Sequence, residues 1–88
     1  MRRPAPTIVD RAIGCALSAI RLARTESGRE CYRMGYSRLR QAQEYARSGP
    51  LKNSDPDLHM IRLRTMLNMA AWWFECGREV EKTMRRAA

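Results

Sequence analysis

The chain of 88 residues is short of the residue types that most enzymes and membrane proteins need. It has one histidine and one phenylalanine, and none of its apolar runs approaches the roughly 18 uncharged residues of a membrane span. The weak signal-peptide pattern near the N-terminus is interrupted by Asp10 and Arg11. We therefore expect a cytoplasmic protein that has no membrane partner.

The scarce cysteine and histidine residues also fail to form a recognisable site. Cys15, Cys31 and Cys76 are odd in number and show no C-x-x-C spacing, which argues against a disulfide framework and against a zinc site. His59 is the only histidine, no obvious partner accompanies it, and it is expected at the surface or at the boundary of the core. No glycine-rich phosphate loop occurs. The sequence predicts a non-enzymatic protein with reduced thiols, no cofactor and no metal.

The residues that are present are typical of a small helical domain. Hydrophobic residues make up 44% of the chain and charged residues 30%, which favours a globular fold. A chain of this length forms one domain, 1–88, and buries only about 60–65% of its unfolded surface, so its core is modest. No segment shows the alternation of a strand. We predict an all-α fold in which residues 1–6 are flexible.

Capping residues, glycines and prolines along the sequence predict a small three-helix bundle with helices at about 8–25, 28–48 and 56–86. Thr7 is placed to cap the first helix, and an S-x-x-E capping box at Ser27 and Glu30 begins the second. The alternative is one continuous helix through Gly28. Gly49 and Pro50 end the second helix, whereas Asp55 and Pro56 begin the long third helix, in which Gly77 is the weak point.

Basic charge is the strongest functional signal in the sequence. Fifteen of the 17 basic residues are arginine, and the first 48 residues hold ten basic against four acidic side chains, a net charge of +6. The last 40 residues hold seven against five, a net charge of +2. An uneven cationic surface attracts phosphates or acidic protein surfaces over distance.

The second predicted helix concentrates this charge on one line. Arg29, Arg33, Arg40 and Arg47 recur at helical spacing, Arg38 flanks them, and Arg21 and Arg24 extend the patch. Guanidinium groups bind phosphate or carboxylate through paired hydrogen bonds. The leading hypothesis is a basic helical binding module that docks on nucleic acid or a nucleoprotein complex by backbone or shape recognition, because no base-reading motif appears. Alternatives are an acidic protein partner and an ordinary solvated face paired with neighbouring glutamates.

The third predicted helix carries an apolar arc wider than two partner helices need. Its core line runs through residues 63–84, but Ile61, Met69 and Trp72 lie outside that line. One explanation is that the third helix is central and the other two cover both of its flanks. The others are a homodimer interface and a protein-binding surface, which would make the chain an adaptor or inhibitor of the kind found in phages and mobile elements.

Overall fold

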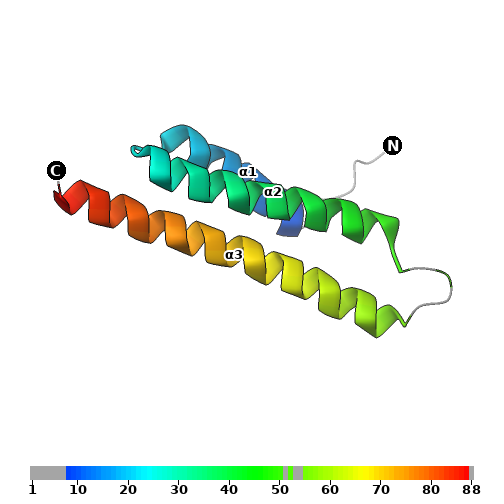
Figure 1. The fold of residues 1–88 in the computed structure, drawn as a ribbon. Coiled ribbons are helices and arrows are strands. Elements are labelled where there is room, and N and C mark those ends of the chain that lie inside the picture. The colour runs from blue at the N-terminus through cyan, green and yellow to red at the C-terminus, as the bar shows by residue number, and fades with distance from the viewer. Residues whose placement is uncertain (1–7, 51, 53–54, 88) are drawn as a thin grey trace, which may run out of the picture.

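Three α-helices make up the part of the chain that the structure describes. The computed structural model describes residues 8–50, 52 and 55–87. They form α1 (Ile8–Leu22), α2 (Glu26–Ser48) and α3 (Pro56–Ala87), as Figure 1 shows. The prediction of an all-α three-helix bundle with a long last helix is confirmed. The expectations for residues 1–6 and for a cap at Thr7 concern positions outside the described residues.

The break between α1 and α2 is confirmed, but its position differs from the prediction. α1 ends at Leu22 rather than near residue 25, and α2 begins at Glu26 rather than at 28. The cap is Thr25, whose backbone is extended (φ −119°, ψ 151°) and whose hydroxyl accepts a hydrogen bond of 3.0 Å from the backbone N–H of Gly28. The predicted capping role of Ser27 is therefore wrong, because Ser27 lies inside α2 and the Thr25 hydroxyl accepts the bond from a free N–H of the first turn.

The turn between α2 and α3 follows the expected chemistry. Gly49 adopts a positive φ of 69°, which ends α2 at a conformation that favours glycine. The carboxylate of Asp55 accepts a hydrogen bond of 3.0 Å from the N–H of Asp57, and Pro56 is the first residue of α3. α3 then continues without a break through Gly77 to Ala87.

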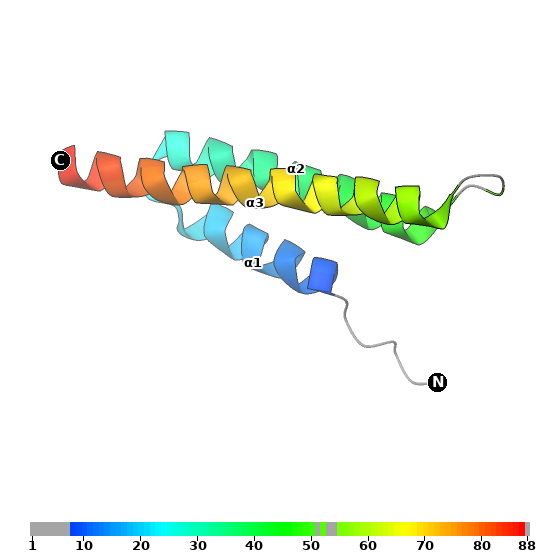
Figure 2. The ribbon, with the colours of Figure 1, turned by 90° about the horizontal axis from the view of Figure 1, so that it is seen from below.

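α2 and α3 form an antiparallel hairpin, and α1 lies across one side of it. Figures 1 and 2 show α2 alongside α3 for most of its length, with α1 diverging from α3 towards its N-terminus. α2 packs against both other helices and is the central one. The interpretation that placed the third helix at the centre is wrong. The reason is that α1 packs mainly on α2, which leaves the outer side of α3 uncovered.

The core is small and lies where the three helices meet. Ile13, Ala16, Leu39 and Ala70 are buried together. Met84, at the end of the predicted core line of the third helix, is about half exposed instead, and so is Leu17 of α1. His59, expected at or near the surface, is buried, and its ring stacks on Tyr45 at a centroid distance of 4.3 Å.

The molecule is thin and elongated. Its Cα radius of gyration is 15.4 Å and its principal extents are 54 × 33 × 13 Å. A compact domain of this length has a radius of gyration of about 12 Å. Among the described residues, no helix is both long enough and apolar enough to cross a bilayer. The thin shape leaves two long edges exposed, one on α2 and one on α3.

Candidate nucleic-acid interface

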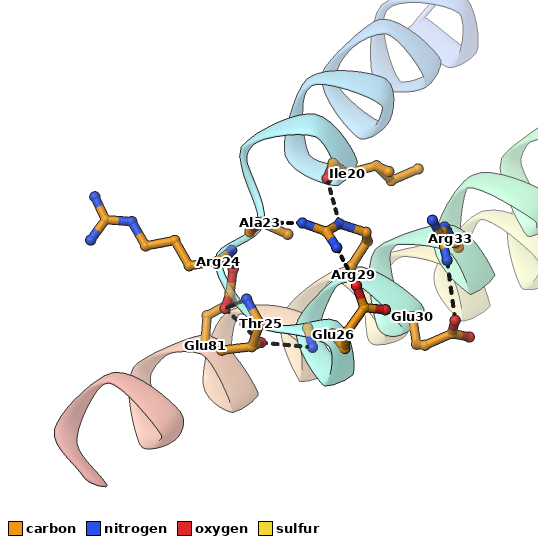
Figure 3. A network of polar contacts seen from close by, with 10 residues as sticks. Ile20, Ala23, Arg24, Thr25, Glu26, Arg29, Glu30, Arg33 and Glu81 are labelled. Carbon is orange, nitrogen blue, oxygen red and sulfur yellow. Dashed lines mark hydrogen bonds and ion pairs between the residues drawn. The ribbon is translucent and has the colours of Figure 1, made fainter. Parts of the chain in front are cut away.

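Arg29 anchors the end of α1 to the start of α2. Its Nε donates to the carbonyl oxygen of Ile20 at 3.4 Å, and its Nη2 donates to the carbonyl oxygen of Ala23 at 2.9 Å. Its Nη1 pairs with the carboxylate of Glu26 (Figure 3). These bonds satisfy carbonyls that α1 leaves unpaired at its C-terminus. Arg29 therefore has a structural role, and little of its guanidinium is left for a ligand.

The same junction is held from α3 by Glu81. Its carboxylate accepts hydrogen bonds from the backbone N–H groups of Arg24 (2.8 Å) and Thr25 (3.1 Å) and from the Thr25 hydroxyl (2.7 Å). The backbone of Arg24 is thereby fixed, but Figure 3 shows its side chain pointing away from Arg29 and Arg33. Arg24 is exposed, although it does not continue the line of arginines on α2.

Three arginines do form a line along the outer edge of α2. Arg33, Arg40 and Arg47 are exposed and stand seven residues apart, which corresponds to about 10.5 Å per step along the helix axis. Nη1 of Arg33 contacts Oε1 of Glu30 at 3.2 Å, and Nη1 of Arg40 donates to Oε1 of Gln43 at 2.9 Å. Each of these bonds joins neighbouring turns of the same helix and engages one end of the guanidinium group.

Gln43 connects this line to α1. Its Nε2 donates to Oδ1 of Asp10 at 2.7 Å, so Asp10 lies on the side of α1 that faces the arginines. Arg21 follows Asp10 by three turns and shares that side of α1, where it is exposed. We call Arg21, Arg33, Arg40 and Arg47 the arginine edge.

Arg38 does not belong to this edge. It lies two residues from Arg40, about 160° around the helix, and its Nη1 donates to Gln41 at 3.4 Å. Of the seven arginines that the sequence singled out, the structure places four along one edge. Arg24, Arg29 and Arg38 point elsewhere or bind the protein itself.

Charge is distributed unevenly between the two edges. Residues 8–48 carry eight arginines and four carboxylates, a net charge of +4. The part of α3 with described side chains, residues 56–84, carries four basic and four acidic residues and is neutral. The positive potential of the described chain therefore belongs to α1 and α2.

Comparison of the chain with models of protein families, with curated proteins and with solved structures finds no match. Function must therefore be argued from the residues themselves.

The described surface also has several cavities, of which one of about 500 Å³ lies between α1, Tyr32 and Phe74. A cavity of about 230 Å³ lies at the α2–α3 turn beside Tyr45, Asp55, His59 and Arg62. Within the described ranges, no three histidine, cysteine or carboxylate side chains gather in a position to hold a metal ion.

The predicted protein-interface residues all lie at the surface of α3. Ile61 is 60% exposed, Trp72 57% and Met69 42%. Leu58, at 40%, adjoins them. Two contacts could not be read from the sequence, namely the capping of α1 by Arg29 and the bond between Gln43 and Asp10. The only signal for the first is an arginine in the first turn of α2, seven residues after the end of α1, where free carbonyls accumulate.

Proposed function

We propose that this protein is a non-enzymatic module that binds the phosphate backbone of a nucleic acid, free or within a nucleoprotein complex, through the arginine edge. The observation that carries the proposal is the exposed line of Arg33, Arg40 and Arg47 on one rigid helix. A guanidinium group has five N–H donors, and the bonds to Glu30 and Gln43 engage only Nη1 of Arg33 and Arg40. The other donors are available for phosphate oxygens.

The spacing of the edge supports backbone binding. Successive arginines stand about 10.5 Å apart along the helix axis. The edge from Arg33 to Arg47 is about 21 Å long, and duplex DNA carries one phosphate per about 1.7 Å of its axis. Several phosphates therefore lie within reach of the arginines of an α2 helix placed against the duplex.

The carboxylates beside the edge limit the affinity. Glu30 and Glu44 lie next to the arginines on α2 and repel phosphates. Binding therefore depends on about four ion contacts, and the logarithm of the binding constant should fall with the logarithm of salt concentration with a slope of about −3 to −4. We expect similar affinity for different sequences of the same length, because phosphate contacts carry no sequence information.

Fluorescence anisotropy with labelled duplex DNA and duplex RNA tests this proposal between about 50 and 200 mM salt. The triple variant R33A/R40A/R47A should lose most of the affinity and reduce the slope by about 2 to 3. The matched control R38A/R62A/R78A removes the same formal charge from other surfaces and should bind almost as well as the original protein. Equal losses in both triple variants would contradict a role for the edge. Absence of binding to either duplex at low salt would refute the proposed function.

A further inference from the structure

The outer edge of α3 is apolar along five turns. Leu58, Ile61, Met69 and Trp72 are its large exposed side chains, and Thr65 and the half-buried Cys76 complete the line. This line, which we call the α3 edge, is about 27 Å long from Leu58 to Cys76. Trp72 and Ile61 lie roughly opposite Phe74 and Gly77, the residues of α3 that pack on α2. No described part of the chain covers this edge.

The chain exposes more surface than a compact monomer of its mass. It exposes 7119 Å² of accessible surface. A compact monomer of its mass, 10.2 kDa, exposes about 5300 Å² according to the scaling of surface with mass. A stable protein–protein interface buries about 800 Å² on each partner. The excess is therefore more than sufficient for one such interface.

The distribution of charge indicates which partner the α3 edge binds. The whole chain carries a net charge of +8, so two copies repel each other through most of their surfaces. The α3 edge is the exception, because residues 56–84 are neutral and the two further arginines of α3, Arg85 and Arg86, follow nine and ten residues after the end of the edge at Cys76. Two copies can approach through α3 without the like-charge repulsion that contact between two arginine edges would create.

The sizes of the side chains along the α3 edge match those of a second α3 edge that runs in the opposite direction. Thr65 and Trp72 are equidistant from a point close to Met69, and so are Ile61 and Cys76. In an antiparallel pairing about that point, Thr65 faces Trp72 and Cys76 faces Ile61, so a smaller side chain meets a larger one in each of these pairs. Met69 would meet its own copy, and methionine packs well on irregular surfaces.

Two charged side chains beside the α3 edge fit the same antiparallel arrangement. Arg64 and Glu75 lie on the same flank of the edge, eleven residues apart, and their midpoint also falls beside Met69. In an antiparallel pair of identical helices, residues on the same flank face each other. Arg64 of each copy would therefore stand opposite Glu75 of the other, twice per dimer. Within the described residues, neither side chain takes part in an ion pair of its own chain.

We propose that the protein forms a two-fold symmetric homodimer in which the α3 edges pack antiparallel, with Trp72 buried against Thr65 and Arg64 paired with Glu75 across the interface. The two arginine edges then lie on the far sides of the dimer, because they occupy the opposite side of each hairpin. The dimer needs no nucleic acid, so its test is independent of the proposed function.

Sedimentation equilibrium of the whole chain, without nucleic acid, tests the dimer and its orientation. We expect the original protein to be dimeric at micromolar concentration. R64E and E75R should each raise the dimer dissociation constant at least tenfold by placing like charges opposite each other. The double variant R64E/E75R should restore dissociation to within about threefold of the original, because the pairs form again with reversed sign. W72A should also raise the dissociation constant at least tenfold.

The control R11E reverses an exposed arginine on α1 and should leave dimerisation unchanged. All these positions are exposed, so circular dichroism should show folded protein in each case. A monomeric original protein would overturn the proposal and assign the α3 edge to a different protein. Retained dimerisation in W72A would also overturn it. Failure of the double variant to recover would overturn the antiparallel pairing.

Discussion

The ring of Tyr32 in α2 lies directly against the backbone of Gly77 in α3. A Cβ atom at residue 77 would stand 2.5 Å from Cε1 and 2.7 Å from Cδ1 of this ring. The reverse arrangement occurs one turn along the hairpin, where a Cβ at Gly35 of α2 would stand 2.7 Å from two ring carbons of Phe74 in α3. Each helix thus provides one aromatic ring and one glycine, and the exchange fixes the register of α2 against α3.

Replacement of Gly77 by alanine should therefore destabilise the fold. Alanine is favoured over glycine inside a helix by about 1 kcal/mol. Overpacking a well-filled site usually costs about 1–3 kcal/mol, and the buried Tyr32 ring has little room to move. We expect the free energy of unfolding of G77A to fall by up to about 2 kcal/mol in urea denaturation, which is the part of the clash that helix propensity does not offset.

Gly14 provides the matched control for this prediction. It is exposed in α1, and a Cβ there would meet nothing within 4 Å. G14A should raise the free energy of unfolding by about 0.4–1 kcal/mol. If G77A were as stabilising as G14A, the close approach of Tyr32 would not determine the packing of the hairpin.

Glu81 should contribute more to stability than any other carboxylate of α3. It connects α3 to the α1–α2 junction through bonds to two backbone N–H groups and the Thr25 hydroxyl. Truncation in E81A leaves these donors without their acceptor, and we expect a loss of about 1–3 kcal/mol in the free energy of unfolding. E79A is the control, because the contact between Glu79 and Lys82 is exposed and contributes about 0–1 kcal/mol.

Substitutions of Arg29 and Arg33 should have opposite relative effects on stability and on nucleic-acid binding. R29A removes the donors that cap the carbonyls of Ile20 and Ala23, and we expect a decrease of about 1–2 kcal/mol in the free energy of unfolding. R33A removes an exposed side chain and should change stability by less than about 0.5 kcal/mol. In the anisotropy measurement the order reverses, because R33A should weaken binding more than R29A does. A larger loss of binding in R29A, measured on folded protein, would show that Arg29 contacts the ligand.

The sequence predicts the helices well because their end signals are local. Gly49, Asp55 and Pro56 act through their own backbone conformation and neighbouring N–H groups, and the structure places the α2–α3 turn at these residues. The start of α2 was misplaced because Thr25 and Ser27 are both good caps. The choice between them depends on Glu81, which is 56 residues from Thr25 along the chain.

The candidate site was predictable only in part, for the same reason. Helical spacing identifies Arg33, Arg40 and Arg47 as one line, but it cannot show that Arg29 bends back to α1. The exposure of Trp72 was also undecided, since the width of an apolar arc does not reveal which helix lies beside it. That depends on whether α1 packs on α2 or on the outside of α3, and the aromatic–glycine contacts between α2 and α3 contribute to this arrangement.

The hairpin should lose stability in alkaline solution through two neighbouring residues of α2. Burial, and then the nearby Cys76, raise the pKa of the Cys31 thiol above its ordinary value of 9.0. Burial, and then the charge of Glu81, raise the pKa of Tyr32 above 10.0. Both groups are neutral when protonated, so between the unfolded and folded pKa values the folded state binds more protons than the unfolded state. Their contribution to stability is complete below about pH 9 and is lost as pH rises through the raised values.

Urea denaturation at several pH values between about 8 and 11 measures this loss. C31S should remove the part of the decline that begins near pH 9, and Y32F should remove the part that begins about one unit higher, because neither replacement titrates. C15S changes an exposed thiol outside the hairpin and should leave the decline as it is in the original protein. A decline unchanged in the double variant C31S/Y32F would show that other groups cause the alkaline instability. Stability that rises above pH 9 would contradict the direction of both pKa shifts.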